Sequence, residues 1–465
     1  MTAYTLLIVE SPTLARIINR FNLPGVEVLA TGGFSWQPIW DTKSEQLKPK
    51  ADPAWVSFRN QLKKKAPWAS RVVIATDADP AGSFISYSIS RFLKSVPTLR
   101  TYIHTLSRDG IQQAIDLASE DSHTDEFEIL RNRYLIQQSL NRTLRDKLGS
   151  NPWSRLVLMY LFEGRIPYTT LVASSSIIKL SKPVELSYNS MLEVRPVTDG
   201  SQNLLCKTDR PLNTSALLEK LFANRGSMKQ DQEHLNRLFT TIPDEPGSGL
   251  ISYPRTSAQG YYAETWALSY QYWIKNNETE TFLPRALWDI LPIQIPHESL
   301  RPINPVIDPA TVRPLVRKNL YDIYTIIYNH YIKSISAASI ESARKVILIQ
   351  DGASMYENEI VGDLNRNAVF STMITISDLL NTMNAYGAAR PSGFGKLFDT
   401  LIDEKWITCS GISIKPGKTY GDTETSGSFP WQSWLEDLVK LMNNPSIEVS
   451  KLKSTLDCMI QELPL

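Results

Sequence analysis

The residues best suited to covalent chemistry lie in one short segment, Gly249 to Thr256, which has the sequence GLISYPRT. Tyr253 stands two positions before Arg255, and Pro254 between them restricts the backbone. A tyrosine hydroxyl can act as a nucleophile, and a planar guanidinium can neutralise a phosphate through paired hydrogen bonds. The segment therefore suggests phosphoryl transfer on a polyanion, although the same residues taken alone also fit a structured turn.

A second block, His297 to Pro302, has the sequence HESLRP and follows the tyrosine block along the chain. His297 is suited to hydrogen-bonding a phosphate or to moving a proton. A single histidine is often only structural, but Glu298 and Arg301 beside it and its position downstream of Tyr253 favour the functional interpretation.

Carboxylates follow two apolar runs near the start of the chain. Glu10 comes after Thr5–Val9, and Asp77 and Asp79 come after Arg71–Ala75. If both runs are parallel strands, their carboxyl ends meet at one edge of a sheet. Oxygen ligands of this kind suit Mg²⁺, which needs few carboxylates because it keeps several waters. The same carboxylates would also fit the caps of the helices that follow.

The surrounding pattern predicts the elements that position these groups. Strands are expected at 5–9, 26–30 and 71–75, with helices from Ser11–Pro12 to about residue 19 and from Gly82 to Leu93. This alternation implies an α/β domain over residues 1–125. Helix is expected over 126–180, strands over 184–210, helices with loops over 213–345, another strand at 345–349 and a mixed tail that ends in a helix.

Composition bounds the class of protein. The 465 residues are 42% hydrophobic and carry a net charge of +1, which is weak support for a nucleic-acid-binding protein and leaves room for a locally basic groove. Neither a membrane-spanning run nor a secretion signal is expected, and the three cysteines have no paired spacing that would suggest a disulfide framework or a zinc ribbon. A cytoplasmic location is the expectation. The triplet Lys63–Lys65 fits a phosphate contact or a solvated face.

Several short blocks together resemble the type IA DNA topoisomerases, nearest to the topoisomerase III branch. In chain order they are Leu6–Pro12, Thr76–Asp79, Gly164–Arg165, Gly249–Thr256, His297–Pro302 and Arg390–Ser392. The first two look like the metal-binding TOPRIM domain of that family, and the last looks like part of its winged-helix region. These matches span most of the chain.

The resemblance implies a multidomain α/β and α+β fold, with a TOPRIM-like α/β domain joined to a toroidal core that has a winged-helix-like region. The implied domains are a TOPRIM-like metal domain over 1–125, a helical, winged-helix-like DNA-binding domain over 126–183 and 365–465, a strand-rich arch over 184–212 and 335–364, and a helical domain over 213–334 that carries the tyrosine.

The resemblance also implies an activity. Tyr253 would cut one DNA strand through a transient 5′-phosphotyrosyl bond, another strand would pass, and religation would need no ATP. Catalytic roles would fall to Tyr253, Arg255, His297 and Glu10, and Mg²⁺ would bind at Glu10, Asp77 and Asp79. DNA contacts would come from Arg165, Arg301, Arg390 and Ser392. The expected partners are single-stranded DNA and supercoiled or catenated DNA, with no membrane.

This sequence departs from the family pattern mainly around the metal site. Pro80, Ala81 and Ser83 stand where the family has an arginine and two carboxylates, and Ser11 and Leu14 stand where it places a lysine. One alternative is therefore a weakened or inactive clamp that binds single-stranded DNA. Another is a nuclease or primase that uses the TOPRIM-like domain, which is disfavoured because that domain carries the losses.

Overall fold

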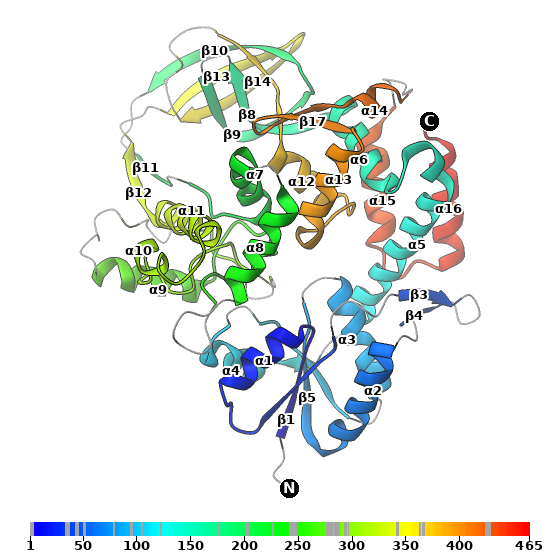
Figure 1. Cartoon of the computed structure of the whole chain (residues 1–465). Coiled ribbons are helices and arrows are strands. Elements are labelled where there is room, and N and C mark those ends of the chain that lie inside the picture. The colour runs from blue at the N-terminus through cyan, green and yellow to red at the C-terminus, as the bar shows by residue number, and fades with distance from the viewer. Residues whose placement is uncertain are drawn as a thin grey trace.

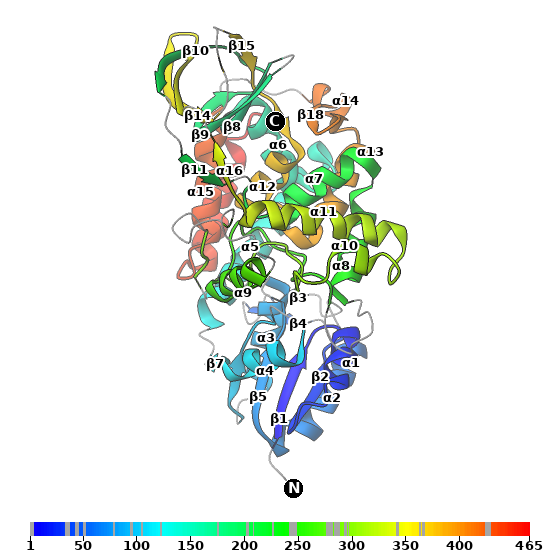
Figure 2. The ribbon, with the colours of Figure 1, turned by 90° about the vertical axis from the view of Figure 1, so that its left-hand side faces the viewer.

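The structure is a computed structural model. It describes residues 4–32, 38–41, 46–49, 53–77, 80–93, 96–103, 106–120, 123–173, 176–200, 204–207, 209–225, 227–240, 249–275, 282, 289–292, 295, 297–340, 344–361, 364, 368–423 and 429–465. An α/β unit that holds the N-terminus lies at one end, a layer of helices lies in the middle, and a β barrel lies at the other end (Figure 1). Figure 2 shows the same order after a quarter turn.

The α/β unit is built on a five-stranded sheet with the order β2-β1-β5-β6-β7. The first four strands in this order are parallel, and β7 is antiparallel to β6. Its elements are β1 (Tyr4–Val9), α1 (Pro12–Arg20), β2 (Val26–Ala30), the hairpin β3 (Pro38–Asp41) and β4 (Gln46–Pro49), α2 (Pro53–Lys65), β5 (Ala69–Ala75), α3 (Pro80–Phe92), β6 (Thr98–Arg100), α4 (Arg108–Asp116) and β7 (Ser119–Glu120). The strands and helices predicted from the sequence here are confirmed.

Helices cover both faces of this sheet, as its continuous apolar strands require. Along β1, Leu6 and Ile8 pack with α2 and α3, whereas Leu7 and Val9 pack with α1 and α4. The residue after β1 and the residues after β5 therefore emerge at one edge, because Val9 pairs with Ala75 in the register of the two strands.

The helices α5 (His123–Leu148) and α6 (Pro152–Glu163) lead out of the α/β unit. Asn151 caps α6, and the residues of α6 from Pro152 to Phe162 are all buried. The tail of the chain returns to pack on this pair with α15 (Trp431–Met442) and α16 (Val449–Gln461), which lie beside α5 in Figure 1. The N-terminal and C-terminal parts of the chain thus share one core.

The prediction of helix from 126 to 180 is wrong beyond Glu163. There the chain enters β8 (Arg165–Ala173) and β9 (Ser176–Ser187), which pair with each other. Ile166 and Tyr168 are buried while the residues before each of them are exposed, and this alternation is that of a strand with one buried face. A closed barrel, β10-β13-β14-β9-β8-β15, satisfies the edges of both strands.

The remaining barrel strands are β10 (Met191–Gly200), β13 (Arg344–Asp351), β14 (Ser354–Val361) and β15 (Ala368–Ser371). The strands predicted over 184–210 and 345–349 are confirmed. In contrast, β15 belongs to the barrel, whereas the resemblance implies that residues from 365 onwards belong to the helical domain. The short pair β11 (Leu204–Lys207) and β12 (Ala337–Ile340) lies between the barrel and the helices (Figure 1).

The helical region between these strands carries the tyrosine block, as predicted. Its helices are α7 (Thr214–Arg225), α8 (Met228–Thr240), α9 (Ala263–Lys275), α10 (Pro309–Val312) and α11 (Lys318–Ile335). The tail then alternates helices and strands, also as predicted. It holds β16 (Ile374–Thr375), α12 (Ile376–Ala385), α13 (Phe394–Asp403), β17 (Ile407–Ser410), β18 (Ser413–Pro416) and α14 (Lys418–Gly421).

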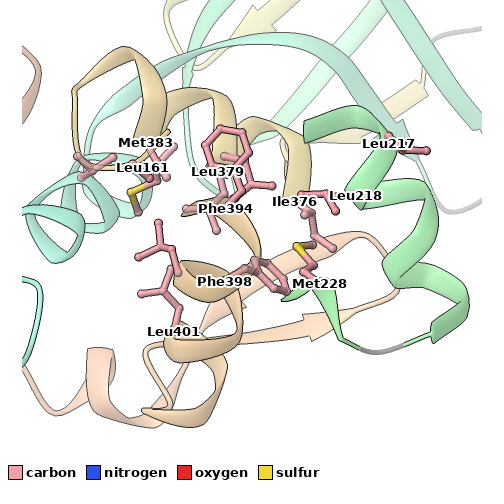
Figure 3. Close-up of a cluster of buried hydrophobic side chains, with 14 of the residues drawn as sticks. Leu161, Leu217, Leu218, Met228, Ile376, Leu379, Met383, Phe394, Phe398 and Leu401 are labelled. Carbon is pink, nitrogen blue, oxygen red and sulfur yellow. The ribbon is translucent and has the colours of Figure 1, made fainter. Parts of the chain in front are cut away.

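Strands β16, β18 and β17 form a small antiparallel sheet next to α12 and α13, an arrangement in keeping with the winged-helix-like region expected there. Figure 3 shows how this region joins the rest of the molecule. Leu161 from α6, Leu218 from α7 and Met228 from α8 lie around Ile376, Leu379, Phe394 and Phe398 from α12 and α13. Segments far apart in the sequence therefore share one apolar core, and this core fixes the helices that carry the site.

None of the helices within the described residues is both long enough and apolar enough to cross a lipid bilayer.

Candidate active site

The tyrosine block and the histidine block lie side by side. Tyr253 belongs to the extended segment between α8 and α9. The amide of Ser252 donates to the carbonyl of Arg301 at 2.9 Å, and the amide of Ile303 donates to the carbonyl of Leu250 at 3.1 Å. The two blocks recognised in the sequence are therefore joined by backbone hydrogen bonds, and each holds the other in place.

Helix α8 supports both this segment and the turn that contains Arg390. The amide of Leu250 donates to the carbonyl of Leu238 at 3.0 Å. On the same helix, the Gln232 side chain accepts the amide of Gly395 at 3.0 Å and donates to the carbonyl of Pro391. The tyrosine segment and the Arg390 turn are thus fixed to one rigid element.

Asp77 is the point where the α/β unit meets the tyrosine segment. The Tyr253 hydroxyl donates to Asp77 Oδ2 at 2.7 Å, and Arg255 Nη1 donates to the same oxygen at 3.3 Å. The amide of Asp77 donates to Glu10 Oε1 at 2.9 Å. One run of hydrogen bonds therefore links the predicted nucleophile, its guanidinium and two of the predicted carboxylates.

The turn that carries Asp77 is held from behind by Arg100, which the sequence analysis did not single out. Arg100 is buried and donates to Thr76 Oγ1 and, at 3.0 Å, to the carbonyl of Asp77. The Thr76 hydroxyl donates in turn to the carbonyl of Gly82 at 2.8 Å. These bonds fix the start of α3 against the end of β5 and so set the position of the Asp77 carboxylate.

The ring of Tyr253 is held between two aromatic side chains. His297 stacks on it with ring centroids 4.0 Å apart and planes 21° apart. Phe239 meets it edge-on at 5.5 Å and 88°. Such contacts orient an aromatic ring at little entropic cost. His297 thus lies next to Tyr253, and the contact described is ring stacking.

The neighbouring tyrosines are not equivalent to Tyr253. Burial raises the pKa of both Tyr261 and Tyr262, and the charge of Glu298 adds to this effect. The Tyr261 hydroxyl bonds to Ser334, and that of Tyr262 donates to a backbone carbonyl. Tyr253 is the member of this segment that is only half-buried and that opens onto a cavity.

That cavity has a volume of about 350 Å³ and joins residues from several parts of the chain. Its lining includes three guanidinium groups, those of Arg133, Arg255 and Arg390, and none of the described residues that line it is acidic. The remaining lining residues are Tyr253, Thr256, Ser257, Ala258, Ile295, His297, Asn384, Ala385, Gly387, Pro391, Ser392, Met442 and Asn443. A basic, acid-free lining beside a hydroxyl nucleophile suits a phosphate ester.

The structure brings together most of the residues predicted for the site. Arg390 and Ser392 line the Tyr253 cavity with Arg255 and His297, although they lie far from them in the sequence. Arg133, Asn384 and Asn443 line it as well and were missed. Arginines and asparagines in amphipathic helices and turns carry no distinguishing local pattern, so only the packing of α5, α12 and α15 reveals them.

Arg301 is placed differently from its predicted DNA contact. Its side chain is buried and donates to Glu298 Oε1 at 2.7 Å and to the carbonyls of Pro302 and Ile303. Burial acts to lower the pKa of Arg301, but the charge and hydrogen bond of Glu298 together with the nearby Tyr331 and Tyr261 outweigh burial and leave the pKa above its usual value. In this position Arg301 stabilises the loop that carries His297 and does not present its charge to a ligand.

Arg165 lies at the start of β8 in the barrel and is not among the residues that line the Tyr253 cavity. Its Nη2 donates to Asp351 at 3.1 Å, to Tyr356 at 2.8 Å and to the carbonyl of Glu185 at 2.8 Å. Its guanidinium remains partly exposed. A contact between Arg165 and DNA therefore stays a prediction.

The predicted metal ligands are described only in part. Glu10 and Asp77 provide carboxylates at adjoining strand ends, whereas Asp79 lies outside the described residues. The described residues contain no cluster of three or more acidic, histidine or cysteine side chains that could hold a metal. Since Mg²⁺ is often bound by one or two carboxylates plus substrate phosphates, the pair fits a weak Mg²⁺ site.

Ser11, which occupies a position of the missing lysine, has a structural role in the fold. Its side chain accepts the amides of Thr13 and Leu14 and caps α1.

Sequence and structure comparisons identify relatives of this chain. Residues 5–106 match the family model of the Toprim domain. DNA topoisomerase 1 of Campylobacter jejuni is 22% identical over 400 residues, which are 74% of this chain and 56% of that protein. Full-length topoisomerase I from Thermotoga maritima matches in structure with a TM-score of 0.65 and 15% identity, over 99% of this chain and 90% of the other. The chain is therefore similar to DNA topoisomerases in sequence, and it shares the fold of the Thermotoga enzyme.

The predicted fold class is confirmed, because the match to the Thermotoga topoisomerase runs through nearly the whole chain and the Toprim match falls on the α/β unit. The predicted placement nearest to the topoisomerase III branch stays a prediction. The chain spans 56% of the length of the Campylobacter protein, so the activity of such a topoisomerase is a proposal for this chain.

Proposed function

We propose that this chain cuts and reseals single-stranded DNA as a type IA topoisomerase does. The observation that carries the proposal is the geometry at Tyr253. Its hydroxyl lies against Asp77 and Arg255, and its segment opens onto a cavity that Arg133 and Arg390 make basic.

The chemistry is a transesterification that balances without a co-reactant. The Tyr253 oxygen attacks phosphorus, a phosphotyrosyl bond forms, and the bond to the 3′ oxygen breaks. The 3′ oxygen takes up a proton from solvent water and leaves as a hydroxyl. The hydroxyl proton passes to Asp77, which already accepts that hydrogen bond at 2.7 Å. Arg255 then turns from Asp77 to the phosphate and neutralises the charge that develops there. Reversal of these steps reseals the strand without ATP.

A bound Mg²⁺ would add positive charge near the phosphate, and Glu10 and Asp77 are the described residues that would hold it. Because two carboxylates of the family pattern are replaced by Ala81 and Ser83, we expect weak binding. Relaxation of supercoiled DNA should therefore require more Mg²⁺ than a relative with the full acidic set requires. Relaxation that persists unchanged in excess chelator would remove the metal from the proposal.

Covalent capture of end-labelled single-stranded DNA tests the tyrosine directly. The wild-type chain should form a complex that survives denaturant, and Tyr253→Phe should form none while it binds DNA with near-normal affinity, because only the hydroxyl is removed. Tyr272→Phe is a suitable control, since Tyr272 bonds to Tyr328 and does not line the cavity. Capture by Tyr253→Phe at the wild-type level would exclude Tyr253 as the nucleophile.

The alternative is a clamp that holds single-stranded DNA without cutting it. The observation that favours it is the loss of carboxylates and of a lysine around an otherwise ordered site. Wild-type protein that binds single-stranded DNA but gives no covalent complex, with or without Mg²⁺, would support this alternative.

A further inference from the structure

One side of the cavity is lined by two turns that meet. One follows α12 and the other follows α15. They approach closely at Gly387, where φ is +73° and a Cβ would lie 3.1 Å from the sulfur of Met442 and 3.1 Å from the ring of Trp153. The packing leaves little freedom for either turn to move relative to the other.

The turn after α15 is also held by hydrogen bonds from side chains of α5. Asn132 is fully buried, and its Nδ2 donates to the carbonyls of Met442 at 3.2 Å and Asn444 at 2.7 Å. Its neighbour Arg131 donates to the carbonyl of Ile447 at 2.8 Å. The residue between the two held carbonyls, Asn443, is exposed and lines the cavity.

Two carboxamides face this cavity with their hydrogen-bonding groups available. Within the described part of the chain, the side chains of Asn384 and Asn443 make no hydrogen bond. Each offers a donor and an acceptor, whereas the arginines of the same cavity offer donors only. In complexes with nucleic acids, guanidinium groups commonly hold phosphates, while paired donor and acceptor groups on a side-chain amide can match the edge of a base.

We propose that Asn443 and Asn384 read the edge of one base beside the phosphate that Tyr253 attacks, and that Asn132 is the positioning residue for Asn443. This inference rests on the proposed function, because it places that phosphate at the Tyr253 end of the cavity. Arg390 and Arg133 hold the flanking phosphates. The volume of about 350 Å³ lies within the range of about 300–1,000 Å³ typical of ligand pockets and suits a nucleotide-sized group.

Covalent cleavage of a single-stranded DNA library tests the base reading. Sequencing of captured ends should show a preference of about tenfold for one base at a fixed position relative to the cut, the size expected of one good amide–base pair. Asn443→Ala should flatten the preference at that position only. Asn444→Ala is the matched control, because the Asn444 side chain bonds to Ser446 and does not line the cavity.

Asn132→Ala tests the positioning role. It should flatten the preference at the same position as Asn443→Ala, although Asn132 cannot touch DNA. Thermal unfolding checks that the variant is folded at the assay temperature. A folded Asn132→Ala that cuts with the wild-type preference would overturn the positioning role, since a loss of stability alone would lower capture equally at every sequence.

Binding separates this inference from the proposed chemistry. Affinities of the captured sequence and of its single-base variants are measured for Tyr253→Phe with and without Asn443→Ala. If no covalent complex forms, the sequences are instead selected for binding from a random-sequence pool, and the same affinities are measured. Base discrimination that Asn443→Ala removes would then support the inference even though the proposed chemistry fails. Discrimination that is absent, or unchanged by Asn443→Ala, overturns the inference and leaves the chemistry standing. Absence of any binding to single-stranded DNA overturns both.

Discussion

At the scale of single residues, the site is organised around the Asp77 carboxylate. Its Oδ2 accepts hydrogen bonds from both Tyr253 and Arg255, and the amide of Asp77 bonds to Glu10. The same carboxylate is a proposed metal ligand and a proposed proton acceptor. Binding of DNA must therefore redistribute these partners, since the phosphate competes for Arg255 and a metal competes for Asp77.

Asp77→Asn should preserve the shape of this centre while removing its charge. Covalent capture should fall by about 10²–10⁴-fold, the usual worth of a positioned general base. Affinity for single-stranded DNA should stay constant or rise, because a negative charge next to the phosphate site is lost. Covalent capture and affinity are measured on the same labelled oligonucleotide. The control is Asp109→Asn, because Asp109 is an exposed residue of α4. Capture by Asp77→Asn that equals the wild type would show that Asp77 takes no proton.

The local sequence identified the residues that do chemistry better than those that support them. Tyr253, Arg255 and His297 stand in short, distinctive sequence motifs, and the structure places them together. Arg301 has equal prominence in its block, yet it is buried on Glu298 because the loop needs an internal cation there. Burial depends on contacts across the fold, so the sequence around Arg301 could not reveal it.

At the scale of elements, strand ends and helix starts determine where the carboxylates lie. The apolar runs of β1 and β5 were readable as parallel strands, and their register brings Glu10 next to Asp77. The helix expected over 165–180 was wrong because the chain there alternates buried and exposed side chains, which only the barrel partners explain. Long-range pairing of this kind has no local signal in the sequence.

Substitution of Gly82 tests how the start of α3 packs against the end of β5. A Cβ at this position would overlap the carbonyl of Asp77, so α3 can begin beside β5 only with glycine there. Gly82→Ala should shift the Asp77 turn and break the bond from Thr76 to the Gly82 carbonyl, which costs about 1–3 kcal/mol of stability by overpacking. Capture should fall with it.

Chemical denaturation and covalent capture measure the two effects of Gly82→Ala. The control is Gly421→Ala, since a Cβ at Gly421 meets no atom within 4 Å. Wild-type stability and capture for Gly82→Ala would mean that the turn tolerates displacement and that the position of Asp77 does not depend on it.

At the scale of the whole molecule, charge is separated in space. The net charge is only +1, but the cavity beside Tyr253 is lined by three arginines and, within the described residues, by no carboxylate. The composition therefore could not predict a polyanion site, whereas the folded arrangement favours one. The two arginines predicted to bind DNA differ in setting, because Arg390 lies in this cavity and Arg165 lies on the barrel beside Asp351.

This difference leads to a prediction about salt. Each phosphate contact on single-stranded DNA contributes a slope of about 0.7 to the dependence of log affinity on log salt. Arg390→Ala should remove close to one such contact. Arg165→Ala should remove less, because Asp351 already neutralises part of the Arg165 charge at 3.1 Å.

Titrations of Tyr253→Phe with single-stranded DNA at several salt concentrations measure both slopes without interference from cleavage. Lys318→Ala serves as the control for loss of one exposed charge, since Lys318 pairs with Asp322 on the outside of α11. A slope for Arg390→Ala that matches the Lys318→Ala control would place the DNA outside the Tyr253 cavity. A full-contact loss for Arg165→Ala would instead extend the DNA path from the cavity to the barrel, and the strand would then follow the long axis of the molecule.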